Sequence, residues 1–262
     1  MKKTKQEKLT YERRNFWKEA NPEEQKKAMA YAIPYIEFLN KAKTERETIA
    51  YTLDILKNNK FTPFGKKGSR KVYSVFHNKT MAMAVIGTEP ISRGFNMIAA
   101  HIDSPRVDLK QNPLYEDSNS ALSCMRTHYY GGIKKYQWVS TPLALHGVII
   151  KNDGSVLHIS IGEKDDEPVF VIPDLLPHLA GKEQYTKNLA DAIEAGKMNL
   201  VFSGMQEPGN DKKEAIKEYA LKRLNEKYGI SEADLQSAEL QLVPAFKARH
   251  SGFDNSLVLG DG

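Results

Sequence analysis

The sequence of 262 residues predicts an α/β fold in two parts. Apolar residues recur at helical spacing within residues 22–39 and 44–58, short β-rich runs follow, and residues 96–100 form a consecutive apolar run. Such a run is typical of a strand that is buried on both faces of an α/β sheet. A chain of this length can form one large core or two smaller ones.

The composition is that of an ordinary soluble protein, since 40% of the residues are apolar and 27% are charged. No run approaches the roughly 20 apolar residues that a membrane-spanning helix needs. Polar residues follow the basic N-terminus where a signal peptide would have its apolar segment. We therefore expect a cytoplasmic protein without a membrane partner. The 38 basic and 33 acidic residues are spread along the chain, which argues against a nucleic-acid partner.

The cysteine content limits the metal chemistry that the chain can support. Cys124 is the single cysteine, so an intrachain disulfide and a thiolate-rich metal site are both excluded. Any metal ion must therefore be held by histidine, aspartate or glutamate side chains.

Two helices are predicted in the N-terminal part of the chain. Asn21 provides an N-cap for a helix over residues 22–39, with a kink expected at Pro34. Residues 44–47, Thr-Glu-Arg-Glu, have the form of a capping box, and apolar spacing extends this second helix to residue 58.

A β-rich region follows these helices. Residues 72–76 and 81–86 are predicted as strands, and the composition of residues 77–80 between them suits a hairpin turn. The apolar run at residues 96–100 is predicted as the next strand. Ligand sites in α/β sheets gather beyond the carboxyl ends of the strands, so the residues after this run lie where such a site forms.

His101 and Asp103 follow that run in the sequence Ala-Ala-His-Ile-Asp-Ser-Pro. Residues i and i+2 of an extended segment point to the same side, so the imidazole can bind a metal ion while the carboxylate orients it. The tripeptide alone is a weak signal. A strand-end histidine that is hydrogen-bonded to a turn aspartate is the alternative.

A second, β-rich part is predicted in the middle of the chain. Residues 110–132 have the composition of loops, and Asp153-Gly154 indicates a hairpin. Strands are predicted at residues 143–150, 156–161, 169–172 and 238–243. A helix is expected over residues 212–228, with Asp211 as its N-cap.

Several other polar residues receive no chemical role. His146 and His158 lie in predicted strands, where packing histidines are commoner than metal ligands. Residues 129–132, Tyr-Tyr-Gly-Gly, lack the lysine of a phosphate-binding loop, and their glycines are expected to permit a tight backbone path at the rim of the site. Ser104 is not surrounded by the Gly-x-Ser-x-Gly elbow of a serine hydrolase.

Segments along nearly the entire chain match one family in the same order. They are residues 44–47, 99–106, 130–133 with Trp138, 143–147, 172–173 with His178, 226–230, 234–235, 238–240, 244–245 and 251–254. In these segments the sequence resembles the N-terminal portion of the aspartyl aminopeptidases, which are zinc metallopeptidases of the aminopeptidase I type.

The resemblance implies a two-zinc site in which His101 is a ligand of one zinc ion and Asp103 polarises this histidine. In such sites the metal ions bind the scissile carbonyl and a bridging water, and a glutamate is the general base. The implied reaction removes the N-terminal residue, commonly acidic, from a peptide substrate. His178 is implied to reach the active site of a neighbouring subunit in a homo-oligomer, and a structural loop histidine is the alternative.

The resemblance also implies the domain organisation. Residues 1–107 and 246–262 are expected to form an incomplete co-catalytic zinc aminopeptidase-like catalytic domain, and residues 108–245 an inserted β-rich oligomerisation domain. The family's Gln-Asp-Asp-Arg-like motif and Glu-Glu pair, which supply further ligands and the general base, are expected beyond Gly262. We therefore expect the isolated chain to be inactive unless a separate chain carrying the C-terminal half completes it. The alternative is a truncated, catalytically inactive oligomerisation or binding protein derived from the same family.

Overall fold

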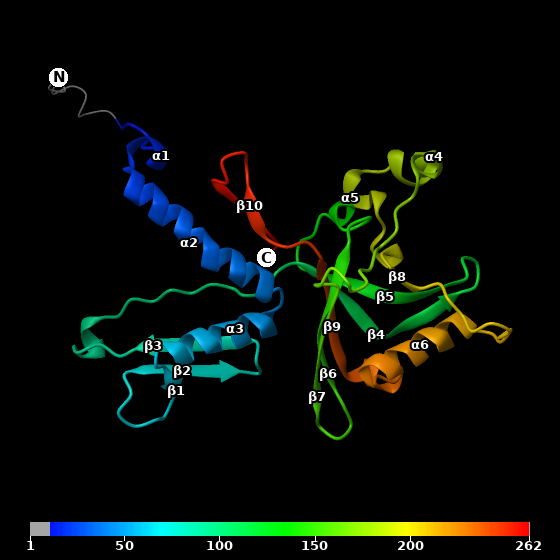
Figure 1. Ribbon diagram of the computed structural model, residues 1–262, viewed down its shortest axis with the longest axis horizontal. Helices are drawn as coiled ribbons and strands as arrows, with labels where there is room; N and C mark the ends of the chain where they lie inside the picture. The colour runs from blue at the N-terminus through cyan, green and yellow to red at the C-terminus, as the bar shows by residue number, and fades with distance from the viewer. Residues whose placement is uncertain (1–10, 262) are drawn as a thin grey trace.

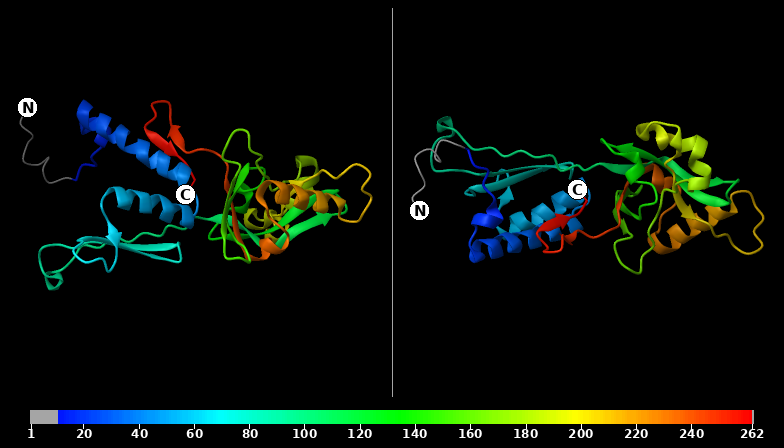
Figure 2. Two further views of the ribbon diagram at one scale, coloured as in Figure 1. Left: turned by 60° about the horizontal axis from the view of Figure 1, so that its bottom comes forward. Right: turned by 90° about the horizontal axis from the view of Figure 1, so that it is seen from above.

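Two lobes joined by two chain segments form the structure of residues 11–261, which the computed structural model describes (Figure 1). One lobe contains three helices, a three-stranded sheet and a two-stranded pair. The other contains a six-stranded sheet with shorter helices around it. Figure 2 shows the two lobes side by side in two further views. This arrangement of helices and strands confirms the predicted α/β class.

The two predicted N-terminal helices begin at the predicted caps, Asn21 and Thr44. Helix α1 (Phe16–Glu19) is short, and α2 spans Pro22–Lys41. The capping box of α2 joins Asn21 and Glu24, and Pro34 lies inside the helix. Helix α3 spans Glu45–Asn58 and begins with a second capping box, which Thr44 forms with the glutamate at the third helical position.

The first sheet has the order β1-β2-β3, where β1 is Thr62–Pro63, β2 is Lys71–Phe76 and β3 is Thr80–Val85. His77 and Asn78 have φ angles of 50° and 54°. They are the central residues of a β-turn in which the Lys79 N–H donates to the Phe76 oxygen at 3.0 Å, and β2 and β3 pair antiparallel on either side of it. The predicted hairpin is therefore confirmed.

The predicted buried strand at residues 96–100 is wrong. This segment follows a short helical turn, η1 (Ile91–Arg93), but pairs with no strand within residues 11–261. The side chains are uncovered, since Met97 is 77% exposed and Ile98 is 97% exposed. An apolar run becomes a buried strand only where other elements supply hydrogen-bond partners and cover its faces, and the described residues supply neither.

The larger sheet has the order β7-β6-β9-β4-β5-β8, with antiparallel pairing throughout. Its strands are β4 (Arg106–Asp117), β5 (Leu122–Tyr130), β6 (Leu143–Ile150), β7 (Val156–Ile161), β8 (Leu200–Ser203) and β9 (Ala238–Pro244). The predictions for β6, β7 and β9 are confirmed. Residues 169–172 form isolated bridges to three neighbouring segments instead of a strand.

The prediction of loops over residues 110–132 is wrong, because β4 and β5 occupy most of this region. The register between the two strands shifts between Leu109 and Leu114, and Asn112 has a φ angle of 50°. The polar residues 110–112 lie at this irregularity and are exposed. An irregular strand with an exposed polar stretch lacks the alternation by which strands are predicted.

The core of this lobe lies between its sheet and the segments packed against it. Leu143 and Leu242, on neighbouring strands, are fully buried. Other members of the cluster include Val107, Met125, Ile149, Ile161, Phe170, Ile172, Met198, Leu200 and Leu224. The remaining elements are η2 (Lys135–Gln137), α4 (Pro177–Ala180), η3 (Gly181–Tyr185), α5 (Leu189–Ala192), η4 (Ala195–Lys197), η5 (Ala233–Ser237), β10 (Arg249–Ser251) and β11 (Leu257–Leu259).

Helix α6 (Ala215–Tyr228) has a different cap from the one predicted, because the helix begins beyond the reach of Asp211. The Glu116 carboxylate of β4 accepts hydrogen bonds from the backbone N–H groups of Ile216 at 2.9 Å and Lys217 at 3.0 Å. A carboxylate at this end also interacts favourably with the helix dipole. The cap is therefore a tertiary contact, 100 residues distant in sequence.

We expect Glu116→Ala to lower the free energy of unfolding by about 1–2 kcal/mol, because it leaves two helix N–H groups without their acceptor. Urea unfolding followed by circular dichroism measures this loss. Asp211→Ala is the matched control and should change stability by less than about 0.5 kcal/mol. An equal loss in both variants would contradict the assignment of the cap.

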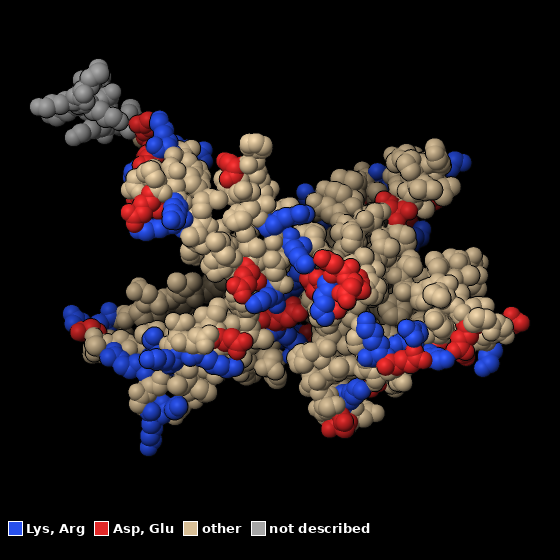
Figure 3. Space-filling view, in the orientation of Figure 1, with Lys and Arg blue, Asp and Glu red and all other residues tan. Residues whose placement is uncertain are grey.

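Among residues 11–261, no helix combines the length and the apolar character that crossing a membrane requires. Figure 3 shows basic and acidic side chains gathered where the two lobes meet.

Candidate functional site

His101 and Asp103 lie in the segment that connects the two lobes. The His101 Nδ1 atom is 2.9 Å from the backbone oxygen of Asp103 and 3.4 Å from its carboxylate Oδ1. Neither oxygen can donate a hydrogen bond, so the proton of the neutral ring lies on Nδ1 and Nε2 keeps its lone pair. The imidazole is 85% exposed. The structure thus presents Nε2 as an accessible nitrogen ligand.

Tyr130, the last residue of β5, binds the second carboxylate oxygen of Asp103, Oδ2. Its phenol donates a hydrogen bond to Asp103 Oδ2 at 2.9 Å. The next residue, Gly131, has a φ angle of 75°, and a side chain at this position would lie against Pro105 at 3.6 Å. The glycine thus lets the chain turn close beside residues 103–105, as expected for a tight backbone path.

Arg106 packs against the face of the Tyr130 ring. Its guanidinium lies 4.0 Å from the centroid of the Tyr130 ring. The arginine side chain is only 8% exposed, and it donates hydrogen bonds to Glu45 Oε1 and Asp108 Oδ1, each at 2.8 Å. Glu45 belongs to α3 in the other lobe, so the contact between the lobes continues into the site.

The hydrogen bonds also affect the protonation of these groups. The Tyr130 phenol, together with the aspartate's own backbone N–H, lowers the pKa of Asp103 below its ordinary value. The same contact raises the pKa of Tyr130, because the carboxylate holds the phenolic proton. Asp103 is therefore an anion beside His101 at neutral pH.

A second cluster of charged side chains lies between the lobes around His146. This residue is 3% exposed on β6, with Nδ1 2.7 Å from Glu47 Oε1 and Nε2 2.9 Å from Glu163 Oε1. Glu163 also accepts from Lys43 Nζ at 2.8 Å. Since both carboxylates only accept hydrogen bonds, both ring nitrogens donate and the imidazole is charged. The prediction of a histidine packed in the sheet was correct in position but missed these partners.

The N-terminal end of α3 forms most of this junction. The carboxylate of Glu47, which closes the capping box, also binds His146. The ion pairs that join this segment to the β-rich lobe are Lys43–Glu163, Glu45–Arg106, Arg46–Glu239 and Glu47–His146. The sequence Lys-Thr-Glu-Arg-Glu therefore begins a helix and fastens the two lobes together.

His178 lies on the short helix α4 and is exposed. This helix projects from the β-rich lobe, away from the connecting segment of residues 94–105 that leads into β4 (Figure 1). The structure therefore does not bring these two residues together within one chain.

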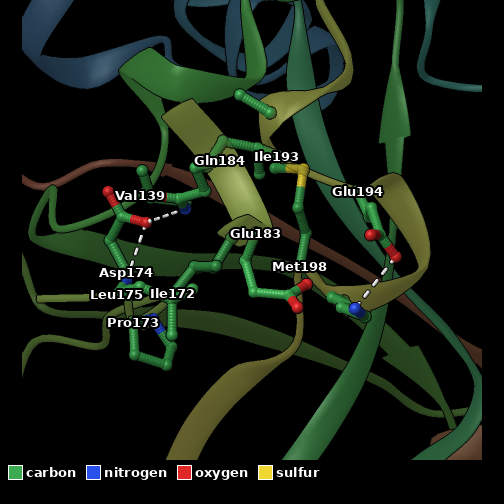
Figure 4. Close-up of a pocket in the computed structure, with 12 residues that line it drawn as sticks. Val139, Ile172, Pro173, Asp174, Leu175, Glu183, Gln184, Ile193, Glu194 and Met198 are labelled. Carbon is green, nitrogen blue, oxygen red and sulfur yellow. Dashed lines mark hydrogen bonds and ion pairs between the residues drawn. The ribbon is translucent and has the colours of Figure 1, made fainter. Parts of the chain in front are cut away.

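A cavity of about 420 Å³ lies beside the segment that follows α4 (Figure 4). Its wall includes the apolar side chains of Val139, Ile172 and Met198. Two of the acidic groups in its lining have partners, since Gln184 donates to Asp174 at 2.6 Å and Lys197 pairs with Glu194 at 3.1 Å. The cavity is a gap in the packing of residues 173–198 on the sheet, and four of its polar residues are engaged with one another in these two pairs.

The residues present fit a metal ion only in part. His101 offers one nitrogen in an accessible position, whereas a catalytic zinc ion normally takes three protein ligands. Within residues 11–261, no group of three or more histidine, cysteine, aspartate or glutamate side chains is arranged to hold a metal ion. The described part of the chain therefore offers one candidate nitrogen ligand and no complete metal site.

Comparison with known proteins identifies the family. The family model described as "Aminopeptidase I zinc metalloprotease (M18)" matches residues 38–262. The chain belongs to the M18 aminopeptidase family. A curated relative, the probable M18 family aminopeptidase 1 of Clostridium acetobutylicum, is 42% identical over 262 residues, which are 97% of this chain and 56% of that relative. The chain thus spans about half the length of the M18 relatives that it matches.

Solved structures share the fold of this chain. The aminopeptidase of the M18 family from Thermotoga maritima has a TM-score of 0.87 at 42% identity, with 95% of this chain and 54% of that chain covered. The S. cerevisiae mApe1 dodecamer has a TM-score of 0.61 at 16% identity, with 87% of this chain and 51% of that chain covered. At this lower identity, the similarity shows the fold alone.

Proposed function

We propose that this chain contributes one part of a two-zinc aminopeptidase site, in which His101 Nε2 is a zinc ligand and Asp103 orients the imidazole. The observation that carries the proposal is the accessible Nε2 of a histidine whose Nδ1 faces two oxygens of Asp103. Membership of a zinc metalloprotease family supports it. When bound, two zinc ions would polarise the scissile carbonyl of a peptide and lower the pKa of a water molecule.

The other ligands and the general base would come from polypeptide outside the described residues, on the same or on a separate chain. Two observations support this proposal. Residues 11–261 contain no complete metal site, and the chain spans 56% of a relative that is 42% identical. The uncovered apolar side chains of Phe95, Met97 and Ile98, next to His101, offer a surface for such a segment. The isolated chain would then lack peptidase activity.

The proposed substrates are peptides with an acidic N-terminal residue, and the proposed setting is cytoplasmic. A homo-oligomer is proposed as well, with residues 1–107 and 246–262 in the catalytic domain and residues 108–245 as the oligomerisation domain. The dodecamer with the same fold supports the assembly. Exposed His178 on α4 would reach the site of a neighbouring subunit.

The function can be tested by fusing the chain to the remaining part of the Clostridium relative. We expect the fusion to bind zinc and to release N-terminal aspartate or glutamate from peptides faster than leucine. His101→Ala should lower the zinc content of the fusion and reduce turnover by more than about 100-fold, since even partners outside the ligand set contribute 10–100-fold. His158→Ala, at an exposed position on β7, is the matched control. Unchanged zinc content and turnover in His101→Ala would refute the proposal.

A second candidate is an assembly protein without catalysis. The separate core of the β-rich lobe favours this function, because it does not depend on a metal site. Such a protein would form a defined oligomer in the presence of a metal chelator, and His101→Ala would leave that oligomer unchanged. Sedimentation velocity of the wild-type chain and of His101→Ala measures the oligomer. An unchanged oligomer together with an inactive fusion would favour the assembly protein over the peptidase.

A further inference from the structure

We infer that Tyr130 is a positioning residue that holds the Asp103 carboxylate against His101 and thereby helps to keep His101 Nε2 open as a ligand. The inference rests on the proposed function for its purpose, but its geometry can be tested without metal. The two carboxylate oxygens of Asp103 face different partners. Oδ2 accepts from the Tyr130 phenol at 2.9 Å, and Oδ1 lies 3.4 Å from His101 Nδ1.

The carboxylate needs this support because its surroundings do not confine it. The side chain of Asp103 is 40% exposed, and residues 94–105 belong to no strand. An aspartate in such a segment has several accessible rotamers. The phenol of Tyr130 selects the one in which Oδ1 faces the imidazole.

Tyr130 is in turn fixed by buried charge. The Arg106 guanidinium lies 4.0 Å from the centroid of its ring, and Glu45 and Asp108 hold that guanidinium with hydrogen bonds of 2.8 Å. Such a cation beneath an aromatic ring is attracted to its face. Burial lowers the pKa of Arg106, but its two carboxylate partners outweigh this effect and raise it, so the cation persists.

The contacts form a continuous series from the lobe junction to the site. Glu45 on α3 binds Arg106, Arg106 supports Tyr130, Tyr130 binds Asp103, and Asp103 faces His101. The geometry of His101 thus depends on residues from both lobes. Tyr130 would touch neither the substrate nor the metal ion, so its contribution is made through Asp103.

The test measures the tautomer of His101 in the full metal-free chain by ¹H–¹⁵N spectra of the imidazole at pH 8.5. The wild-type ring should carry its proton on Nδ1. Tyr130→Phe should lower the ratio of the Nδ1–H to the Nε2–H form by roughly fivefold, the factor expected for loss of one ordinary hydrogen bond. The backbone oxygen of Asp103 remains as an acceptor, which limits the change.

Tyr129→Phe is the matched control, since this neighbouring tyrosine stacks on His128 instead. Asp103→Ala, in the exposed segment, should produce the same change as Tyr130→Phe, and the double variant should show no further change. An unaltered tautomer ratio in Tyr130→Phe, or an additive change in the double variant, would overturn the inference. If Tyr130→Phe does not fold, an unaltered ratio in Asp103→Ala would overturn it alone. Retention of zinc by His101→Ala would refute the proposed function while leaving the tautomer result intact.

Discussion

Gly147→Ala should lower the free energy of unfolding by about 3 kcal/mol or more, because the backbone of β9 leaves no room for a side chain. A Cβ atom at Gly147 would lie 1.9 Å from the backbone oxygen of Glu239 and 3.1 Å from the Cα atom of Leu240. The φ angle of Gly147 is 140°, which residues with a side chain rarely adopt. Backbone strain and overpacking each cost about 1–3 kcal/mol, and here they add.

The lost stability can be measured as the difference in urea midpoint between the wild type and Gly147→Ala. Gly154→Ala is the matched control. Gly154 also has a positive φ angle, 82°, but a Cβ atom there would meet no other atom within 4 Å. The control should lose only about 1–2 kcal/mol, the ordinary cost of the left-handed conformation. Similar losses in both variants would show that β6 and β9 can separate to accept the added methyl group.

The elements that could be predicted from the sequence carry their signals within a few neighbouring residues. The capping boxes that begin α2 and α3 each involve residues only three positions apart. The turn at His77 and Asn78 needs only two residues that tolerate positive φ. Likewise, the contact between His101 and Asp103 follows from their i, i+2 spacing, although the segment that carries them is not a strand.

The features that the sequence did not indicate depend on distant partners. The strand predicted at residues 96–100 lacks neighbours among the described residues, and β4 and β5 pair in spite of a polar, irregular stretch. Arg106 and Glu45, which support the candidate site, are 61 positions apart. No local sequence pattern indicates such a pair, because an arginine or a glutamate considered alone is typical of an exposed surface.

The junction around His146 shows the same limit most clearly. Glu47 was predictable as part of a capping box, but its second partner, His146, is 99 positions away. The helix cap and the contact between the lobes therefore use one carboxylate. For this reason the charge state of a single buried histidine affects how the two lobes are held together.

The wild-type protein should lose about 3 kcal/mol of stability between pH 6 and pH 9.5 through His146. Burial lowers the pKa of this histidine, but Glu163 and Glu47 outweigh burial and raise it from 6.5 to about 9. A folded-state pKa above the unfolded value gives stability that is complete below pH 6.5 and is lost as the pH rises through about 9. Each pKa unit corresponds to about 1.4 kcal/mol.

Glu163 changes the stability in the opposite direction, because its contribution is lost as the pH falls. Burial raises the pKa of Glu163, but His146 and Lys43 lower it below its ordinary value of 4.5. The stability from this carboxylate is therefore present above pH 4.5 and is lost at lower pH. The cluster of His146, Glu47, Glu163 and Lys43 should thus contribute most between about pH 4.5 and pH 6.5.

Urea unfolding of the wild type and His146→Phe at pH 6 and pH 9.5 tests the alkaline loss. The variant should be less stable at pH 6, because Glu47 loses its cationic partner, but its stability should change little between the two pH values. His158→Phe is the control, and this exposed histidine on β7 should leave the wild-type pH dependence in place. If the free energy of unfolding changed equally between pH 6 and pH 9.5 in the wild type and in His146→Phe, the imidazole would not be charged between the lobes. The lobes would then be joined chiefly by the ion pairs of Lys43, Arg106 and Arg46.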